Sequence, residues 1–229
     1  MASSPGEAAT PRARPVNANE EMKRVIPVIR KLSKQTKAVI SIDTTKAKVA
    51  EAAIKAGASM INDVSALRSD VKMARIAGKY KVPIVLMHML GDPRNMQKNP
   101  RYRDLIPDII CYLQNSITLA IKGGVSREKI IVDPGFGFGK LVEHNLEILR
   151  GLKALRVLGC PILIGTSRKS TIGKVLGLPP DQRIEGTAAT VAAAIANGAN
   201  IVRVHDIQEM SRVVKMCDSI YKGIGGLLK

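Results

Sequence analysis

The chain has 229 residues, 45% of them hydrophobic, and a formal net charge of +17. This length and apolar content suffice for one sizeable domain with a buried core, which excludes a globally disordered chain. The charge favours an anionic partner, such as nucleic acid, membrane phosphate or a phosphorylated substrate, or else a basic surface that aids solubility. Because the cations are spread along the chain without interleaved aromatic residues or zinc-finger spacing, we expect no nucleic-acid partner.

The N-terminal stretch, 1–16, is polar and rich in Ala and Pro, and it lacks the apolar segment of a secretory signal. We therefore interpret 1–16 as a flexible leader and 17–229 as a single domain. No apolar run is long enough for a membrane span, so we expect no membrane partner. The three cysteines are widely spaced, which favours a reducing compartment over a disulfide framework. These features predict a cytoplasmic protein, or an organellar one if the source is a eukaryote.

Helix and strand signals alternate along the chain. Asn17 or Asn19 is placed to cap a first helix, which contains Pro27. Short apolar runs then predict six strands, at 38–43, 59–63, 82–88, 130–133, 161–165 and 200–204. Helical patterns are expected at 20–34, 46–56, 71–80, 104–122, 144–158, 186–197 and 208–221. The segments between them include a loop over 91–103 and a loop or short helix over 171–184.

This alternation predicts an α/β protein with a parallel sheet and right-handed crossovers. The strands are short and almost wholly apolar, as strands buried on both faces are. Polar residues follow every strand, and a barrel would gather all of them on one face, whereas an open doubly wound sheet would gather only some. We therefore predict a TIM-type (β/α)8 barrel in which about six of the eight βα units are present.

The stretch 130–140, IIVDPGFGFGK, is the most distinctive in the chain. Asp133 ends an apolar run, and the three glycines after it allow the backbone to turn and to approach a flat ligand or a phosphate. A Walker loop is excluded because Leu141 follows Lys140, and the third glycine of a dinucleotide fingerprint is missing. The alternative is a glycine turn with a helix-capping aspartate.

Asp43, Asn62 and Asp133 each end a predicted strand. Around one pocket, two carboxylates and an amide can read the donor and acceptor edge of a heterocycle. The alternative is that each side chain caps the helix that follows it. Met87 and Phe138 would supply apolar walls to such a pocket, although as core residues they need no special role.

A second group is basic. The motif GTSRKS at 165–170 offers a glycine turn, hydroxyl groups and two cations, and Arg203 and His205 lie on one side of an extended segment. Together these residues can clamp a phosphate or pyrophosphate. The alternatives are a salt bridge for Arg203 and a polar rim position for His205.

Seven motifs taken together resemble dihydropteroate synthase, and they occur in the family's order over roughly 17–222. They are SIDT (41–44), GASMINDVSAL (57–67), VLMHMLGDPRNMQ (85–97), DPGFGFGK (133–140), GTSRKS (165–170), EGTAA (185–189) and IVRVHD (201–206). The wider pterin-binding group, which includes pterin-dependent methyltransferases, shares the Asp, Asn and Asp strand ends. The SRK and RVHD motifs favour the synthase.

The resemblance implies an eight-stranded βα barrel, often a homodimer, that works in folate biosynthesis with Mg²⁺. It would join 6-hydroxymethyl-7,8-dihydropterin pyrophosphate to p-aminobenzoate and release pyrophosphate, which leaves before the amine attacks. By motif match, catalysis would rest on Asp43, Asp133 and Lys169. The same resemblance implies that substrate is bound by Asn62, Met87, Phe138, Gly165, Ser167, Arg168, Lys169, Arg203 and His205, with Ser167 and Arg168 near the aminobenzoate entrance.

The chain also departs from the family pattern at its start. Nothing corresponds to the family's first strand, whose loop carries an Asn ligand of Mg²⁺, so we assign no metal ligand in this chain. The family's second strand is expected to be missing too. Residues 6–13, GEAATPRA, are an eroded form of the family's Gly-Glu-Ser-Thr-Arg-Pro-Gly-Ala loop, and Arg12 or Arg14 is a candidate for the lost arginine. Three interpretations stay open: a synthase, a methyltransferase relative, and a pterin-binding scaffold without catalysis.

Overall fold

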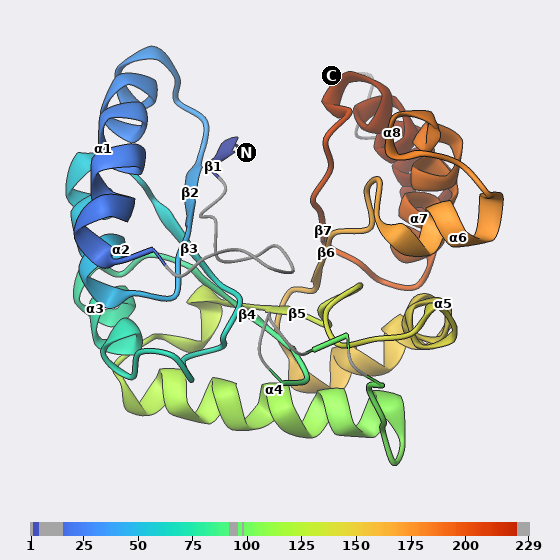
Figure 1. Cartoon of the computed structure of the whole chain (residues 1–229), viewed down its shortest axis with the longest axis horizontal. Coiled ribbons are helices and arrows are strands. Elements are labelled where there is room, and N and C mark those ends of the chain that lie inside the picture. Colours follow the sequence, from blue (N-terminus) through green and yellow to red (C-terminus); the bar gives the residue numbers. More distant parts are fainter. Residues whose placement is uncertain (1, 5–15, 92–95, 98, 224–229) are drawn as a thin grey trace.

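The computed structural model describes residues 2–4, 16–91, 96, 97 and 99–223, and in it helices surround a curved parallel sheet (Figure 1). Each of the six predicted strands is present. The strands are β1 Ala2–Ser4, β2 Ile40–Asp43, β3 Met60–Asp63, β4 Ile84–Met87, β5 Ile130–Asp133, β6 Leu163–Ile164 and β7 Ile201–Val202.

The strands follow one another around the sheet in sequence order. β1 to β5 form one parallel sheet and β6 and β7 a second, and a single parallel bridge between Val132 and Ile162 connects the two. This order, with a helix after each strand, confirms the predicted barrel arrangement. β1 was not expected, because it lies in the stretch interpreted as a leader. Among the described residues it adds a seventh strand, paired in parallel with β2, to the six that were predicted. Most of that stretch, 5–15, lies outside the described residues.

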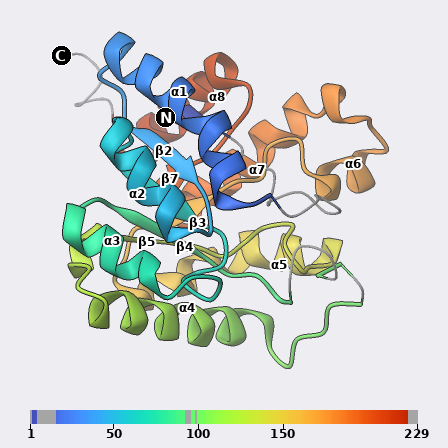
Figure 2. The same cartoon turned by 60° about the vertical axis from the view of Figure 1, so that its left-hand side comes forward.

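The helices also follow the predictions closely. They are α1 Ala18–Gln35, α2 Ala47–Ala56, α3 Lys72–Tyr80, α4 Leu105–Lys122, α5 Val142–Gly151, α6 Ser170–Leu176, α7 Ile184–Ala196 and α8 Ile207–Lys222. Asn17, not Asn19, caps α1, because its side chain accepts a hydrogen bond from the Glu20 N–H at 2.9 Å. The helix expected over 144–158 becomes a 3-10 helix from Leu152. α4 packs along β4 and β5, as Figures 1 and 2 show.

Alternate strand residues form two separate apolar layers. Residues such as Ile42, Ile61 and Leu86 are buried under the helices in the main core. Their neighbours point inward, where Met60, Val85, Ile131 and Leu163 pack together with the partly buried Ile201. Because strand side chains alternate, the next inward positions along each strand share the interior of the barrel at its C-terminal end. Those positions hold the polar residues singled out from the sequence.

Candidate functional site

The inward positions above the apolar layer are Asp43, Asn62, Met87, Asp133, Gly165 and Arg203. Parallel register places Asp43 beside Asn62 and Met87 beside Asp133. The alternative that these polar side chains cap the following helices is wrong: α2, α3 and α5 begin after Lys46, Val71 and Leu141, none of which makes a side-chain cap. The strand ends therefore deliver these side chains to one face of the barrel.

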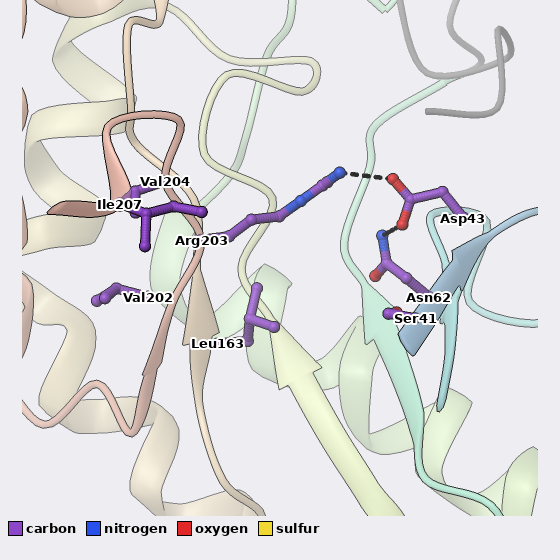
Figure 3. Close-up of a pocket in the computed structure, with 8 residues that line it drawn as sticks. All are labelled: Ser41, Asp43, Asn62, Leu163, Val202, Arg203, Val204 and Ile207. Carbon is purple, nitrogen blue, oxygen red and sulfur yellow. Dashed lines mark hydrogen bonds and ion pairs between the residues drawn. The ribbon is translucent and has the colours of Figure 1, made fainter. Parts of the chain in front are cut away.

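Asp43 is the centre of a three-residue network that joins the ends of β2 and β3 to the segment after β7. It accepts a hydrogen bond from Asn62 Nδ2 at 2.7 Å through Oδ1, and one from Arg203 Nη2 at 2.6 Å through Oδ2 (Figure 3). Burial raises the pKa of Asp43, and the Arg203 guanidinium and the Asn62 amide oppose that rise. The salt bridge that was the alternative role for Arg203 is thus present, and it lies inside the site.

The same network borders a cavity of about 160 Å³. The lining residues are Ser41, Asp43, Asn62, Leu163, Val202, Arg203, Val204 and Ile207 (Figure 3). Ser41 Oγ is buried there without a hydrogen-bond partner among the described residues. A polar atom of this kind is normally satisfied by water or by a ligand, so the cavity has one more group that can contact a polar molecule.

Asp133 is held by the glycine loop that follows it. The Gly135 N–H donates to Asp133 Oδ1 at 2.7 Å. Gly135 has φ +70°, and a Cβ added there would lie 1.8 Å from the carbonyl oxygen of His88. Only glycine fits this turn. Further along, the Gly137 N–H donates to the buried Asn145 Oδ1 at 2.7 Å. The loop is therefore fixed closely against the end of β4.

Lys169 crosses this loop from the start of α6. Its Nζ donates to the Phe136 carbonyl and lies 4.4 Å from the centroid of the Phe138 ring. Burial and the charge of Arg203 lower the pKa of Lys169 to about 8, while Asp133 opposes the shift. Burial raises the pKa of Asp133, and the Gly135 N–H and the charges of Lys169, Lys140 and Arg203 oppose that rise. Asp133, Phe138 and Lys169 thus form a compact group with one carboxyl group, one amine and one aromatic face.

The basic segments come together as predicted, with one exception. The His205 N–H donates to Ser167 Oγ at 3.2 Å, and His205 Nδ1 lies 3.0 Å from the same oxygen. Arg168, by contrast, is paired with Asp206, to which its Nε donates at 3.0 Å. This ion pair lowers the pKa of Asp206. Ser167 and His205 therefore face one another, and Arg168 makes its ion pair beside them.

The apolar residues Met87 and Phe138 lie beside the polar strand ends. Met87 is buried in a small cluster with Val64, Met89 and Met96, and the partly buried Phe138 packs against it. Gly165 lies directly beside Arg203, since a Cβ added at Gly165 would lie 3.6 Å from Arg203 Cβ, an ordinary van der Waals distance. These contacts are compatible with a flat ligand between the Asp43–Asn62–Arg203 network and the group formed by Asp133 and Lys169.

Two buried charged residues have roles that the sequence analysis did not assign. Asp63 accepts hydrogen bonds from Ser65 and Leu67, and so shapes the loop after β3. Lys140 is buried, and its Nζ lies 2.9 Å from Nδ1 of the buried His88. The only sequence signal for Lys140 was its place at the end of the glycine-rich stretch. Within the described part of the chain, no group of three or more His, Cys, Asp or Glu residues could hold a metal ion.

Comparisons with known proteins agree with this geometry. The family model described as "Pterin binding enzyme" matches residues 5–205. A dihydropteroate synthase of Bacillus subtilis is 46% identical over 215 residues, which are 94% of this chain and 73% of that protein.

Two solved structures are similar as well. The Clostridium difficile dihydropteroate synthase with pteroic acid has a TM-score of 0.88 and 47% identity, covering 94% of this chain and 80% of that one. The Xanthomonas albilineans dihydropteroate synthase with 4-aminobenzoic acid has a TM-score of 0.89 and 38% identity, covering 95% and 78%.

Proposed function

The chain belongs to the pterin-binding enzyme family and, within it, to the dihydropteroate synthases, and from this premise we propose how its strand-end residues work. As a transferase of folate biosynthesis, it joins 6-hydroxymethyl-7,8-dihydropterin pyrophosphate to p-aminobenzoate and releases pyrophosphate. The assignment of roles rests mainly on the Asp43–Asn62–Arg203 network. It places two groups that can hydrogen-bond to a heterocycle, Asp43 and Asn62, and a cation that can bind an anion, Arg203, at one cavity.

The pterin lies between the two polar groups. Asp43 with Asn62, and Asp133, accept hydrogen bonds from ring N–H and amino groups of the pterin, and Lys169 donates to its acceptor edge. Met87 and Phe138 cover the faces of the ring. Support comes from the buried, hydrogen-bonded state of Asp43 and Asp133, which orients both carboxylates before a ligand arrives.

The leaving group lies at the basic segments. Arg203 exchanges its bond with Asp43 for bonds with the pyrophosphate, and His205 contacts the same anion. The C–O bond of the pterin methylene breaks first, and the aminobenzoate nitrogen then forms the C–N bond and loses a proton. The anionic Asp133 stabilises the positive charge that develops on the pterin between these steps. We place aminobenzoate near Ser167 and Arg168.

Magnesium is typical of the family, where it balances the charge of the pyrophosphate. The described residues do not fit a protein-held ion, since they contain no group of three metal-ligating side chains. Among the residues that the structure describes, we assign the contacts with the leaving group to Arg203 and His205. A homodimer is a further proposal from the family, and sedimentation of the purified chain tests it.

The cytoplasmic setting is likewise a proposal. No helix within the described residues has the length and apolar character needed to cross a membrane. Cys111, Cys160 and Cys217 are free thiols, as expected in a reducing compartment. Labelling of intact and lysed cells with a thiol reagent that does not cross membranes tests whether the chain is exported, because a chain inside the cell reacts only after lysis. Fractionation of the cells then separates a cytoplasmic chain from an organellar one.

The decisive experiment is product formation by the purified chain. The chain is incubated with the pterin pyrophosphate, p-aminobenzoate and Mg²⁺, and dihydropteroate is detected by mass. Product well above that of a Lys169→Ala control is expected. Pterin binding without any product would support the scaffold interpretation instead. A methyltransferase relative has no need of the SRK and RVHD segments, so the pairing of Ser167 with His205 counts against it.

A further inference from the structure

A buried cation lies beneath the glycine loop and outside the proposed ligand contacts. Lys140 is only 4% exposed. Its Nζ lies 2.9 Å from His88 Nδ1 and donates to the Phe138 carbonyl, also at 2.9 Å. A buried ammonium is costly unless it is paired and hydrogen-bonded, so this placement calls for a compensating charge.

His88 is a neutral acceptor for that ammonium. The side chain is buried, and its ring lies edge-on to Tyr112 with 4.6 Å between centroids. Burial, together with the charges of Lys140 and Arg68, lowers the pKa of His88 to about 2. The imidazole is therefore uncharged at neutral pH, with Nδ1 accepting from Lys140 and the proton on Nε2.

Lys140 connects two parts of the site. Through His88 it contacts the end of β4, and through the Phe138 carbonyl it holds the glycine loop that forms one wall of the pocket. The backbone N–H of His88 also donates to the backbone carbonyl of Asp133 at 2.9 Å, which connects the end of β4 to the start of the same loop. A change at Lys140 therefore reaches both Asp133 and Phe138.

The charges around Lys140 come from several elements. Asp133 at the end of β5 is the nearby anion, Lys169 is the nearby cation, His88 is neutral, and the Tyr102 ring lies 5.9 Å away. Burial lowers the pKa of Lys140 to about 7, and Asp133 limits the decrease. The proton on Lys140 and the negative charge on Asp133 therefore support one another.

We propose that Lys140 is a positioning residue of the pterin site, whose ammonium fastens the glycine loop to His88 and keeps Asp133 ionised for the ligand. The identity of the ligand rests on the function proposed above. Lys140 itself makes no contact with the pterin in this proposal. It acts through Asp133 and Phe138, and it makes pterin affinity depend on pH near neutrality.

The test is calorimetric binding of 6-hydroxymethylpterin between pH 6 and 9. With the unsubstituted chain, affinity is expected to be highest near pH 6 and to fall as pH rises through about 7, where the Lys140 proton is lost. Lys140→Met should weaken binding by about tenfold at pH 6.5, and much less at pH 9. Lys153→Met, at an exposed position, is the matched control and should bind like the unsubstituted chain.

Lys140→Gln separates the charge from the hydrogen bonds and guards against misfolding of the Met variant. It can still donate to Phe138 or His88, so it should fold, yet it should lack the decline in affinity near pH 7 and keep only the decline near pH 8 that the Lys169 proton causes. A flat profile for the unsubstituted chain, or profiles shared by all the variants, would overturn the inference about Lys140 alone. No pterin binding by the unsubstituted chain at any pH would overturn both this inference and the proposed function.

Discussion

The two carboxylates of the site, Asp43 and Asp133, are held in opposite ways. Asp133 is fixed locally, because the Gly135 N–H two residues later donates to it and glycines shape the loop. Asp43 is fixed by distant parts of the chain: Asn62 comes from the next strand, and Arg203 is 160 residues away. Asp133 therefore depends on local backbone conformation, whereas Asp43 depends on how β2, β3 and the segment after β7 are brought together.

This difference predicts different kinds of sensitivity. Substitutions in the glycine loop should act on folding, because the backbone has no alternative conformation of similar energy. Substitutions at Arg203 should act mainly on ligand binding, since its ion pair with Asp43 is partly exposed and is exchanged for the ligand.

The largest effect is expected for Gly135→Ala. The new Cβ would lie 1.8 Å from the His88 carbonyl oxygen at φ +70°, so the free energy of unfolding should fall by about 3 kcal/mol or more. Gly177→Ala is the matched control, with the same φ and nothing within 4 Å, and should cost only about 1 kcal/mol. Urea denaturation measures both, and equal losses would show that the contact with β4 is unimportant.

Asn145→Ala should have the next largest effect on the same loop. Asn145 is buried, accepts from the Gly137 N–H and donates to Thr171 Oγ1 at 2.9 Å. Leaving these partners unsatisfied should cost about 2 kcal/mol in the free energy of unfolding. Asn115→Ala on the exposed face of α4 should change it by less than about 0.5 kcal/mol. Similar losses of unfolding free energy in the two variants would contradict a stabilising role for the hydrogen bonds of Asn145.

Lys169→Ala, beside Asp133, and Arg203→Ala, beside Asp43, should weaken the binding of different ligands. Lys169→Ala should weaken pterin binding, and Arg203→Ala should mainly weaken pyrophosphate binding, each by roughly 10- to 100-fold, as for a charge-assisted hydrogen bond. Isothermal titration with each ligand separately measures this. If both substitutions weaken both ligands equally, the assignment of roles is wrong.

The smallest effect is expected at Glu51, which lies away from both Asp43 and Asp133. Glu51 bonds to Lys79 and Tyr80, which lower its pKa to about 2. Its folded-state pKa is depressed, so its contribution to stability is present above about pH 4.5 and is lost as pH falls towards 2. The melting temperature of Glu51→Gln should be slightly below that of the unsubstituted chain at pH 7 and equal to it near pH 2. A gap that stays constant with pH would exclude this linkage.

Much of the fold could be read from the sequence, because short apolar strands alternate with amphipathic helices and each residue pattern reflects local geometry. The six strands from β2 to β7 were expected at their places, and the Asn17 cap follows from a side chain that is short enough to reach the Glu20 N–H. β1 was missed because Ala2–Ser4 has no apolar pattern, and only pairing with β2 makes it a strand.

The sequence by itself determined which residue types stand at the strand ends, and hence that Asp43, Asn62 and Asp133 share one face of a barrel. It could not determine their partners. The Asp43–Arg203 bond, the pairing of Arg168 with Asp206 and the burial of Lys140 against His88 all join segments that are far apart in the chain. Such contacts depend on how the strands are arranged in space, and only the tertiary structure decides that.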